Sequence, residues 1–564
     1  MTLQEYENLR KIDRKEVLER MKKSLDWTDR TDDDNYDWSS DDTYMVLSCF
    51  VLWRIKNKGG FESGKDYMRK AASSEFYESY EEVLSFLDSN NKWKQFVELK
   101  NKFSDEELKA VVIFEDLSEY QNMTPNGIIE LSEKVLDVHA GDILTEYCAN
   151  YFEFSLYEAL RHQDWMISAY EDSYYFPSIA SAKQQMLDLE NLSINRGAET
   201  LCESDKIFVN LGDWNTVSEA VEEELDRNGK KKWKNVPSES TYTRDICLAA
   251  AASLNKNGRA VIIMRAGQLS GKETEDVRRF FVESNYVSGV IALTDKLYDK
   301  TWNNTYLLVL ERDSQKIRFC DARNKYNKEF VKGKHINSLS EDNIQEIYRD
   351  YIDGTDFSIT VDKEEVREGD YVLLPQRYTS VNSYKEKKKL GEYLRGISRG
   401  ITLSGNEINK YIGKGGVKCV TPASLSNGVI SKAVYFDQDS FTKKINYTSY
   451  GDILINKTGK PIKAAVADGK YVVVGNTYIL QLEYGSINPY YLKCFLESSK
   501  GQAEIEKYAV GANTPLISIE NLKKIEIPVF DKEKQEEIAK EAEALTRQLQ
   551  EAVYRMDDLD EMFD

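Results

Sequence analysis

The fold class of this chain is decided by residues 257–312, NGRAVIIMRAGQLSGKETEDVRRFFVESNYVSGVIALTDKLYDKTWNNTYLLVLER. Three apolar runs of strand length lie in this stretch, RAVIIMR (259–265), VSGVIAL (287–293) and TYLLVLER (305–312). Between the first two, TEDVRRFFVES (274–284) repeats its apolar residues at the three- and four-residue spacing of a helix. Strands that alternate with helices predict an α/β fold with a mostly parallel sheet.

The same alternation continues upstream of this stretch. The runs DILTEYCA (142–149), WMISAYE (165–171) and DKIFVNL (205–211) are predicted strands, so we place an α/β domain at residues 111–365. Residues 1–110 contain no proline and repeat their apolar residues at helical spacing. They are therefore predicted to form a separate helical domain, with helices that include YMVLSCFVLWRI at 44–55 and FYESYEEVLSFL at 76–87.

Charge is unevenly spread over the 564 residues, whose formal net charge is −20. Residues 366–530 hold 23 Lys and Arg against 15 Asp and Glu, a net charge of +8, together with 16 of the 30 glycines. The acidic remainder carries −21 in residues 1–365 and −7 in residues 531–564. A net charge of −20 argues against nucleic-acid binding only if it is evenly spread, because phosphate contacts require Lys and Arg. The basic segment, with its short strands broken by Gly, Asn and Ser, is instead predicted to be an α+β module that binds nucleic acid.

Residues 531–564 are predicted to form one long helix with a heptad seam. Its apolar residues repeat at a and d positions over about four heptads, which favours a coiled coil with a partner helix. The alternative is an amphipathic helix that lies on its own domain. The seam consists of Ile538, Ala542, Leu545, Leu549, Ala552, Met556, Leu559 and Phe563.

Cysteines and histidines give no sign of a metal or disulfide site. The seven cysteines are scattered without a C-x-x-C pair, and His139, His162 and His335 lie far apart in the sequence. We therefore expect structural or surface histidines and no metal site. No window has the length and apolar character of a signal peptide or membrane span, so we expect a cytoplasmic protein that is not in a membrane.

Residues 257–312 resemble the second half of the methyltransferase domain of type I restriction-modification M subunits and related adenine-N6 DNA methylases. In that family a strand after "gGr" leads to an arginine-containing helix, then to "avI.Lp..lf" and a threonine-led final strand. EYQNMTPNGIIELSEKVL (119–136) is similar to the "fyTP..iv.lm..ll" segment that precedes the family's cofactor-binding strand. The resemblance implies a Rossmann-like methyltransferase domain over residues 111–365 that follows a helical N-terminal domain.

The basic module resembles part of a second protein, the specificity (S) subunit. KKLGEYLRGISRGITLSG (388–405), GDILINKTG (451–459) and the stretch from Ala509 to Leu545 are similar to the start, middle and end of a target recognition domain. The resemblance implies half of an S subunit, with a target recognition domain at 366–530 and a spacer or dimerisation helix at 531–564.

The donor-binding turn of the family is altered in this chain. In the family it reads approximately D-P-x-C-G-x-G, since S-adenosylmethionine lies against a glycine backbone that leaves it room. The corresponding stretch is TEYCANY (145–151), which keeps the cysteine and loses both glycines. The acidic residue that holds the cofactor ribose corresponds to a glutamate at a strand end. The altered cofactor-binding positions are Glu146, Cys148, Ala149, Tyr151 and Glu171.

The catalytic turn of the family is altered as well. It reads N-P-P-aromatic, and it accepts hydrogen bonds from the target amine while the flipped-out adenine stacks on the aromatic ring. Here the asparagine remains, both prolines are lost, and the tryptophan is displaced by one position, so the turn is no longer held rigid. The altered catalytic positions are Asn210, Leu211, Gly212, Asp213 and Trp214.

Basic residues interleaved with tyrosines mark the expected DNA-binding surface of the module. Lysines of this kind contact phosphates, whereas base discrimination comes from loop residues that reach the major groove. The predicted DNA-binding residues are Lys385, Lys387, Lys388, Lys389, Arg395, Arg399, Lys414, Lys418, Lys443, Lys444, Lys457 and Lys460.

Three functions remain open from the sequence. The favoured one is a sequence-specific binder of double-stranded DNA, of restriction-modification or phage-defence type, whose methyltransferase domain is an inactive scaffold (a pseudoenzyme) without a cofactor. The second is an active adenine-N6 methyltransferase with divergent motifs that uses S-adenosylmethionine. The third is an interaction protein that recruits a nuclease or translocase subunit. A homodimer through the C-terminal helix is compatible with each of them.

Overall fold

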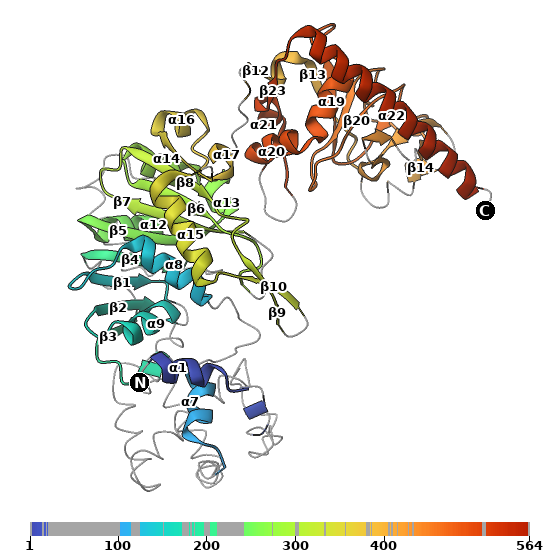
Figure 1. Cartoon of the computed structure of the whole chain (residues 1–564). Helices are drawn as coiled ribbons and strands as arrows, with labels where there is room; N and C mark the ends of the chain where they lie inside the picture. The colour runs from blue at the N-terminus through green and yellow to red at the C-terminus, as the bar shows by residue number, and fades with distance from the viewer. Residues whose placement is uncertain are drawn as a thin grey trace. The chain divides into compact units, whose positions relative to one another are not determined.

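The chain forms two compact units, residues 1–372 and 373–564, in a computed structural model (Figure 1). We refer to them as unit 1 and unit 2. The structure describes residues 3–13, 16–17, 20, 102–113, 124–149, 152–171, 180, 183–184, 187–196, 203–210, 242–272, 274–298, 304–331, 334–355, 357–379, 384, 386–403, 407, 410–413, 416–426, 428–430, 434–509 and 515–561.

A nine-stranded sheet with the order β11-β8-β6-β7-β5-β4-β1-β2-β3 forms the centre of unit 1. Strands β1 to β5 run parallel to their neighbours in the order 3-2-1-4-5, and β7 runs antiparallel between β5 and β6. The expected α/β class with a mostly parallel sheet is thus confirmed. The strands are β1 (Ile143–Tyr147), β2 (Met166–Glu171), β3 (Leu192–Arg196), β4 (Ser204–Asn210), β5 (Leu254–Arg265), β6 (Val287–Ala292), β7 (Thr305–Glu311), β8 (Lys316–Asp321) and β11 (Ser358–Asp362).

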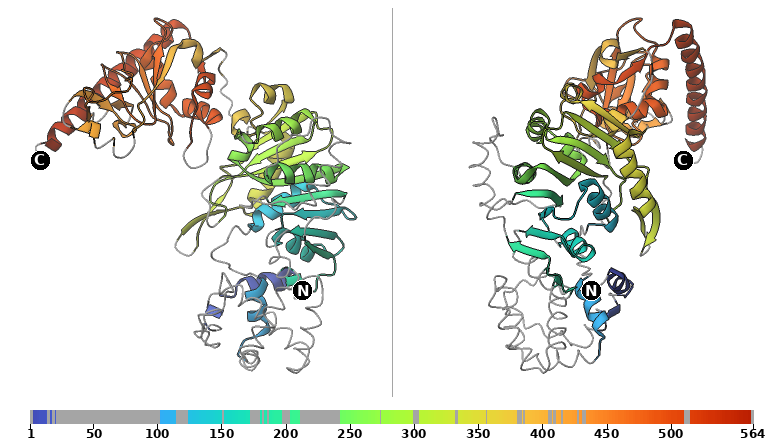
Figure 2. Two further views of the ribbon diagram at one scale, coloured as in Figure 1. Left: turned by 180° about the vertical axis from the view of Figure 1, so that it is seen from behind. Right: turned by 60° about the vertical axis from the view of Figure 1, so that its left-hand side comes forward.

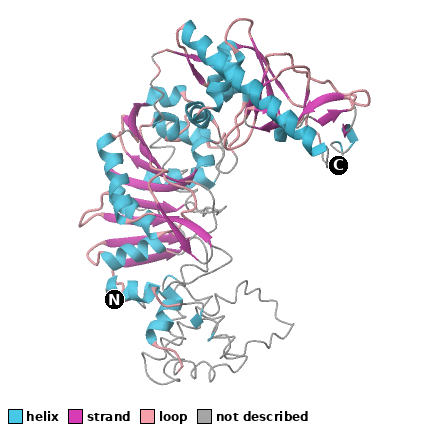
Figure 3. Cartoon of the chain, turned by 45° about the vertical axis from the view of Figure 1, so that its right-hand side comes forward, coloured by secondary structure: helices cyan, strands magenta, loops and turns pink. Residues whose placement is uncertain are grey.

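Helices lie along the stacked strands of this sheet (Figure 3). In α8 (Asn126–Leu136) Ile128, Leu131 and Val135 share one face, so the helix buries an apolar stripe in the core of unit 1. A hairpin of β9 (Asn327–Val331) and β10 (Lys334–Ser338) leaves the sheet (Figure 1). The other helices are α1 (Leu3–Arg10), α7 (Asp105–Ile113), α9 (Glu153–Arg161), α12 (Tyr242–Ser253), α13 (Ala266–Ser270), α14 (Glu275–Glu283), α15 (Glu341–Arg349), the π-helix η1 (Asp350–Gly354) and α16 (Lys363–Glu368).

The helical domain predicted for residues 1–110 is described only in part. Helix α1 and most of α7 fall within it, whereas the predicted helices at 44–55 and 76–87 lie outside the described residues. None of the helices in the described part of the chain combines the length and the apolar character needed to cross a bilayer.

Unit 2 contains two four-stranded sheets and several helices. Their orders are β13-β22-β19-β20 and β14-β18-β15-β21, and short pairs join β12 to β23 and β16 to β17. The strands are β12 (Lys387–Lys389), β13 (Leu394–Arg399), β14 (Ile412–Gly413), β15 (Val417–Val420), β16 (Leu425–Ser426), β17 (Val429–Ile430), β18 (Val434–Phe436), β19 (Ile453–Asn456), β20 (Ala464–Val466), β21 (Val472–Val473), β22 (Thr477–Leu482) and β23 (Glu526–Pro528). The helices are α17 (Gln376–Thr379), η2 (Leu390–Tyr393), η3 (Pro422–Ser424), α19 (Pro489–Glu497), α20 (Ser499–Tyr508), α21 (Ile519–Lys524) and α22 (Lys532–Glu561).

The terminal helix α22 runs along one side of unit 2 (Figure 2). It packs against α19, and its Ala539 is buried in the core of the unit. Further along, Gln550 exchanges two hydrogen bonds with the backbone of Ile430 in β17, at 2.6 and 3.2 Å. The side chains of one apolar row remain exposed, with exposed fractions of 54% for Leu545, 43% for Leu549, 70% for Met556 and 57% for Leu559.

Candidate functional site

The order of the strands changes direction between β1 and β4. From β1 the sheet continues to β2 and β3 on one side, and β4 and β5 follow on the other. Tyr147 of β1 pairs with Val209 of β4, so Cys148 and Asn210 follow at the same edge of the sheet. Ligands of open α/β sheets bind at such a switch point, outside the carboxyl ends of the strands. The structure therefore brings the altered donor and catalytic turns together.

Asn210 is held by a segment far away in the sequence. Its Nδ2 donates a hydrogen bond to Thr124 Oγ1 at 2.7 Å, and both side chains are buried. The buried Tyr298 hydroxyl neighbours both of them, and burial raises the pKa of Tyr298 above its usual value. The remaining catalytic positions, 211–214, lie outside the described residues.

Thr124 and Tyr298 are site residues that the sequence did not single out. A signal was present, because each lies in a segment that carries the family resemblance, TP at 124–125 and LY at 297–298. Their contact with Asn210 was not predictable, since it depends on how three separate segments meet at the edge of the sheet.

The turn after β1 is tight and occupied by side chains. Cys148 and Phe152 adopt left-handed backbone conformations, with φ of 54° and 61°. Phe152 is fully buried, and the buried Ala149 donates its N–H to the Tyr170 carbonyl at 3.1 Å. The Ala149 methyl group therefore stands at the first glycine position of the family pattern. Tyr151, at the second, lies outside the described residues.

A buried carboxylate caps the helix that follows this turn. Glu146 of β1 accepts hydrogen bonds from the Ser155 backbone N–H, at 3.0 Å, and from the Ser155 hydroxyl, both in the first turn of α9. Burial, with help from the nearby carboxylates of Glu153 and Glu171, raises the pKa of Glu146 to about 8. Glu171 itself is buried at the end of β2, so acidic groups surround the switch point.

The predicted DNA-binding residues are spread over several elements of unit 2. Two of them form ion pairs, Lys387 with Glu526 at 2.9 Å and Lys443 with Glu407 at 3.4 Å. Lys385 and Lys414 lie outside the described residues. The others are Lys387, Lys388 and Lys389 on β12, Arg395 and Arg399 on β13, Lys418 on β15, Lys443 and Lys444 after β18, and Lys457 and Lys460 between β19 and β20.

Lysines of unit 2 lie over the faces of tyrosines. A cation in this position is attracted by the π electrons of the ring, so each pair holds its lysine near an aromatic surface. Lys418 also lies opposite Tyr435, on the outward face of β15 and β18. The stacked pairs are Lys388 with Tyr393 at 4.9 Å, Lys410 with Tyr411 at 4.8 Å, Lys470 with Tyr447 at 4.2 Å and Lys500 with Tyr384 at 5.2 Å.

Lys410 and Lys470 were not among the predicted DNA-binding residues. Lys410 directly precedes Tyr411, a tyrosine of the predicted pattern, so the sequence offered a local signal for it. Lys470 likewise precedes Tyr471, but its contact with Tyr447 was not predictable, because the strand pairing around β21 brings Tyr447 beside it.

Two family models match adjoining parts of the chain. The N-6 DNA methylase model matches residues 195–387, and the type I restriction modification DNA specificity domain matches residues 382–554. The donor turn at 145–151 precedes the first match, whereas Asn210 lies inside it.

Two curated methylase subunits are similar to this chain over a short segment. The chain is 34% identical over 151 residues to the type I restriction enzyme MpnII methylase subunit of Mycoplasma pneumoniae, and 31% identical over 151 residues to the MjaVIII methylase subunit of Methanocaldococcus jannaschii. Each match covers 25% of this chain and 26% of the relative, so the similar segment spans about a quarter of either length.

A nuclease-deletion mutant of the type ISP restriction-modification enzyme LlaGI, solved with a DNA substrate mimic, has a similar fold with a TM-score of 0.51. It is 11% identical, and the similarity covers 96% of this chain and 66% of that one. At this identity the likeness shows the fold alone. The two family matches show that the chain combines a domain of the N-6 DNA methylase family with a type I restriction-modification DNA specificity domain.

Proposed function

We propose that this protein recognises double-stranded DNA through unit 2, and that its methylase domain is a scaffold that does not transfer methyl groups. The observation that carries the second part is the Glu146 cap. The first turn of α9 offers backbone N–H groups, which favour an anionic ligand group, and Glu146 already accepts one of them. The Ala149 methyl group also stands where the family has a glycine, against which the methyl donor lies.

The purified full-length chain is expected to transfer no labelled methyl group to duplex DNA and to show no saturable binding of S-adenosylmethionine. An active type I methylase, assayed in parallel, controls for the donor and the DNA. Methyl transfer above the DNA-free background, or micromolar binding of the donor in calorimetry, would contradict the proposal. That result would favour the alternative, an adenine-N6 methyltransferase with divergent motifs.

Recognition of DNA by unit 2 is supported by the net charge of +8 over residues 366–530 and by the specificity-domain match. The double variant Lys418→Ala, Lys444→Ala removes two exposed cations. If each contacts a phosphate, binding to a random duplex weakens, and the slope of log K against log salt falls by about 2. Lys532→Ala, at the exposed start of α22, is the matched control. An unchanged salt slope in the double variant would show that these two lysines do not contact phosphates.

Two kinds of protein partner belong to the proposal. A second copy of the chain would bind through the exposed apolar row of α22, and the resulting dimer would present two recognition domains to two half-sites. A nuclease or translocase subunit would give the complex its effect in restriction or phage defence. Co-purification of the tagged chain from its native host, followed by an assay for DNA cleavage, tests for such a subunit.

A further inference from the structure

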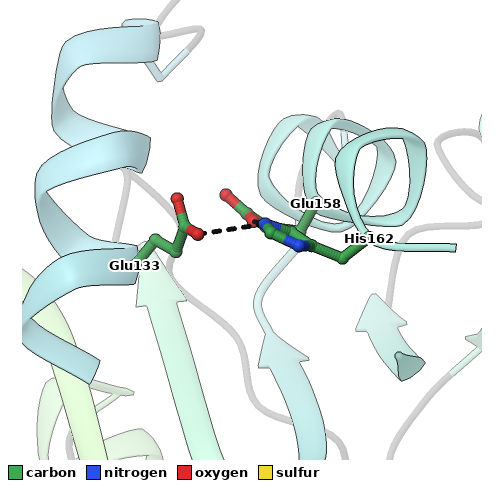
Figure 4. A group of neighbouring side chains, drawn as sticks. All are labelled: Glu133, Glu158 and His162. Carbon is green, nitrogen blue, oxygen red and sulfur yellow. Dashed lines mark hydrogen bonds and ion pairs between the residues drawn. The ribbon is translucent and has the colours of Figure 1, made fainter. Parts of the chain in front are cut away.

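A carboxylate and histidine cluster joins α8 to α9 in unit 1 (Figure 4). Glu133 extends from α8, and Glu158 and His162 lie one turn apart at the end of α9. His162 Nε2 lies 3.0 Å from Glu133 Oε1 and 3.6 Å from Glu158 Oε2. One ligand atom from each of the three residues lies within 4.8 Å of the other two.

Glu158 is the most unusual member of this cluster. Its side chain has an exposed fraction of 0%, and neither carboxylate oxygen accepts a hydrogen bond from any residue that the structure describes. The cationic group of Arg161 is 3.7 Å away, beyond hydrogen-bond distance. An ionised carboxylate in such a place needs a further ligand to offset the cost of its desolvation.

The charged groups around the cluster carry an excess of negative charge that a bound cation would balance. Arg161 donates a hydrogen bond to Glu133, and Glu130 accepts one from the Tyr157 hydroxyl at 2.7 Å. When Glu130, Glu133 and Glu158 are all ionised, one guanidinium balances one of them. The two remaining negative charges equal the charge of one divalent cation.

The donor set and its spacing select the metal. Zinc binds histidine nitrogen and carboxylate oxygen at about 2.0–2.2 Å in tetrahedral geometry, which places neighbouring ligand atoms about 3.3–3.5 Å apart. The two distances from His162 Nε2, 3.0 and 3.6 Å, lie on either side of that value. Mg²⁺ and Ca²⁺ prefer oxygen ligands and higher coordination numbers. The His162 ring also stacks on Trp165 at 3.6 Å with an interplanar angle of 8°, which fixes its plane.

We propose that Glu133, Glu158 and His162 bind one Zn²⁺ ion that fastens α8 to α9, with water at the fourth position. Helix α8 begins directly after Thr124 and Pro125, and α9 follows the turn after β1. The ion would therefore hold in place the two helices that flank the switch point of the sheet. Glu133 and His162 are partly exposed, with side-chain fractions of 16% and 27%, so the ion has a path from solvent.

The test uses the full chain without a polyhistidine tag, after dialysis against a chelator. Titration with ZnCl₂ in a calorimeter is expected to show one equivalent bound, and zinc is expected to raise the unfolding temperature of the protein. Co²⁺ in place of zinc is expected to give the intense visible absorption of a tetrahedral site. Glu158→Gln and His162→Asn are each expected to weaken zinc binding at least tenfold, while His139→Asn, an exposed histidine after α8, leaves it unchanged.

With Glu158→Gln, a loss of zinc binding can be distinguished from a failure to fold. Because this change removes a buried carboxylate that accepts no hydrogen bond from the described residues, the variant is expected to fold and to unfold at the temperature of the metal-free parent or above it. The proposal is overturned if the parent binds no stoichiometric zinc, if both variants bind it as the parent does, or if Mg²⁺ binds equally well.

Discussion

Replacing Leu549 and Met556 with glutamate is expected to disrupt the proposed pairing of two copies of the chain through α22, so that the variant sediments as a monomer. Binding to a duplex with two half-sites is expected to weaken by about 10²- to 10⁴-fold, because the second recognition domain is no longer held near the DNA by the first. Both side chains belong to the exposed apolar row of α22, at a positions of the predicted seam. A carboxylate at an a position would be buried in the pair without a partner.

The design of this variant follows from how α22 packs on its own unit. Removal of residues 531–564 would also make a monomer, but it would uncover the core around Ala539 and break the contact between Gln550 and Ile430. The two glutamate substitutions leave these contacts intact.

The matched control adds negative charge to α22 away from the apolar row. Lys540→Glu with Ala544→Glu changes two exposed positions, at f and c of the heptad, that do not flank the predicted seam. Analytical ultracentrifugation and binding to duplexes with one or two half-sites give the readout. A dimeric L549E/M556E variant would refute the coiled-coil pairing.

Replacing Glu146 with glutamine is expected to change how the stability of unit 1 depends on pH. The folded protein raises the pKa of Glu146 from its ordinary 4.5 to about 8, so folding favours the protonated form. The stabilisation from that form is complete below about pH 4.5 and is lost as the pH rises through 8. Glutamine is neutral at every pH, so the parent loses about 4 kcal/mol of unfolding free energy relative to E146Q by about pH 9.

Urea denaturation between about pH 5 and pH 9 measures this difference. Glu190→Gln, which changes an exposed glutamate of the same unit, controls for the loss of a carboxylate. Parallel pH profiles for the parent and E146Q would mean that Glu146 is ionised in the folded protein at neutral pH.

The central strands of unit 1 were predictable because they are apolar and short. RAVIIMR falls inside β5, VSGVIAL covers β6, and TYLLVLER covers β7. Strand β3, LSINR, was missed, since only two of its five residues are strongly apolar and it pairs on one side alone. The first residues of β5, LNKNG at 254–258, were missed for a similar reason, because they are polar and rich in asparagine.

The side-chain contacts of the candidate sites could not be predicted. Glu146 was identified only as a residue in the place of a proline, and its role as a cap depends on how α9 starts. His162 gave no signal of a site, because Glu133 is 29 residues away in the sequence and on another helix. The heptad seam of α22 was visible in the sequence. Which part packs on unit 2 was not, since Ile538 and Ala542 of the seam contact the core whereas Leu545 is exposed.

The place of β4 between β1 and β5 sets an order of events during synthesis. Synthesis reaches β1 at Ile143, whereas its neighbour β4 begins at Ser204. At about 5–20 residues per second, β4 is therefore made about 3–12 s after β1. A partial sheet of β1, β2 and β3 formed in this interval would leave β1 as an edge strand, open to pairing with other nascent chains. Glu146 lies within that strand, and a charged residue in an edge strand opposes such pairing. The residue that replaces the family's proline is therefore placed to limit misassembly while the sheet is incomplete.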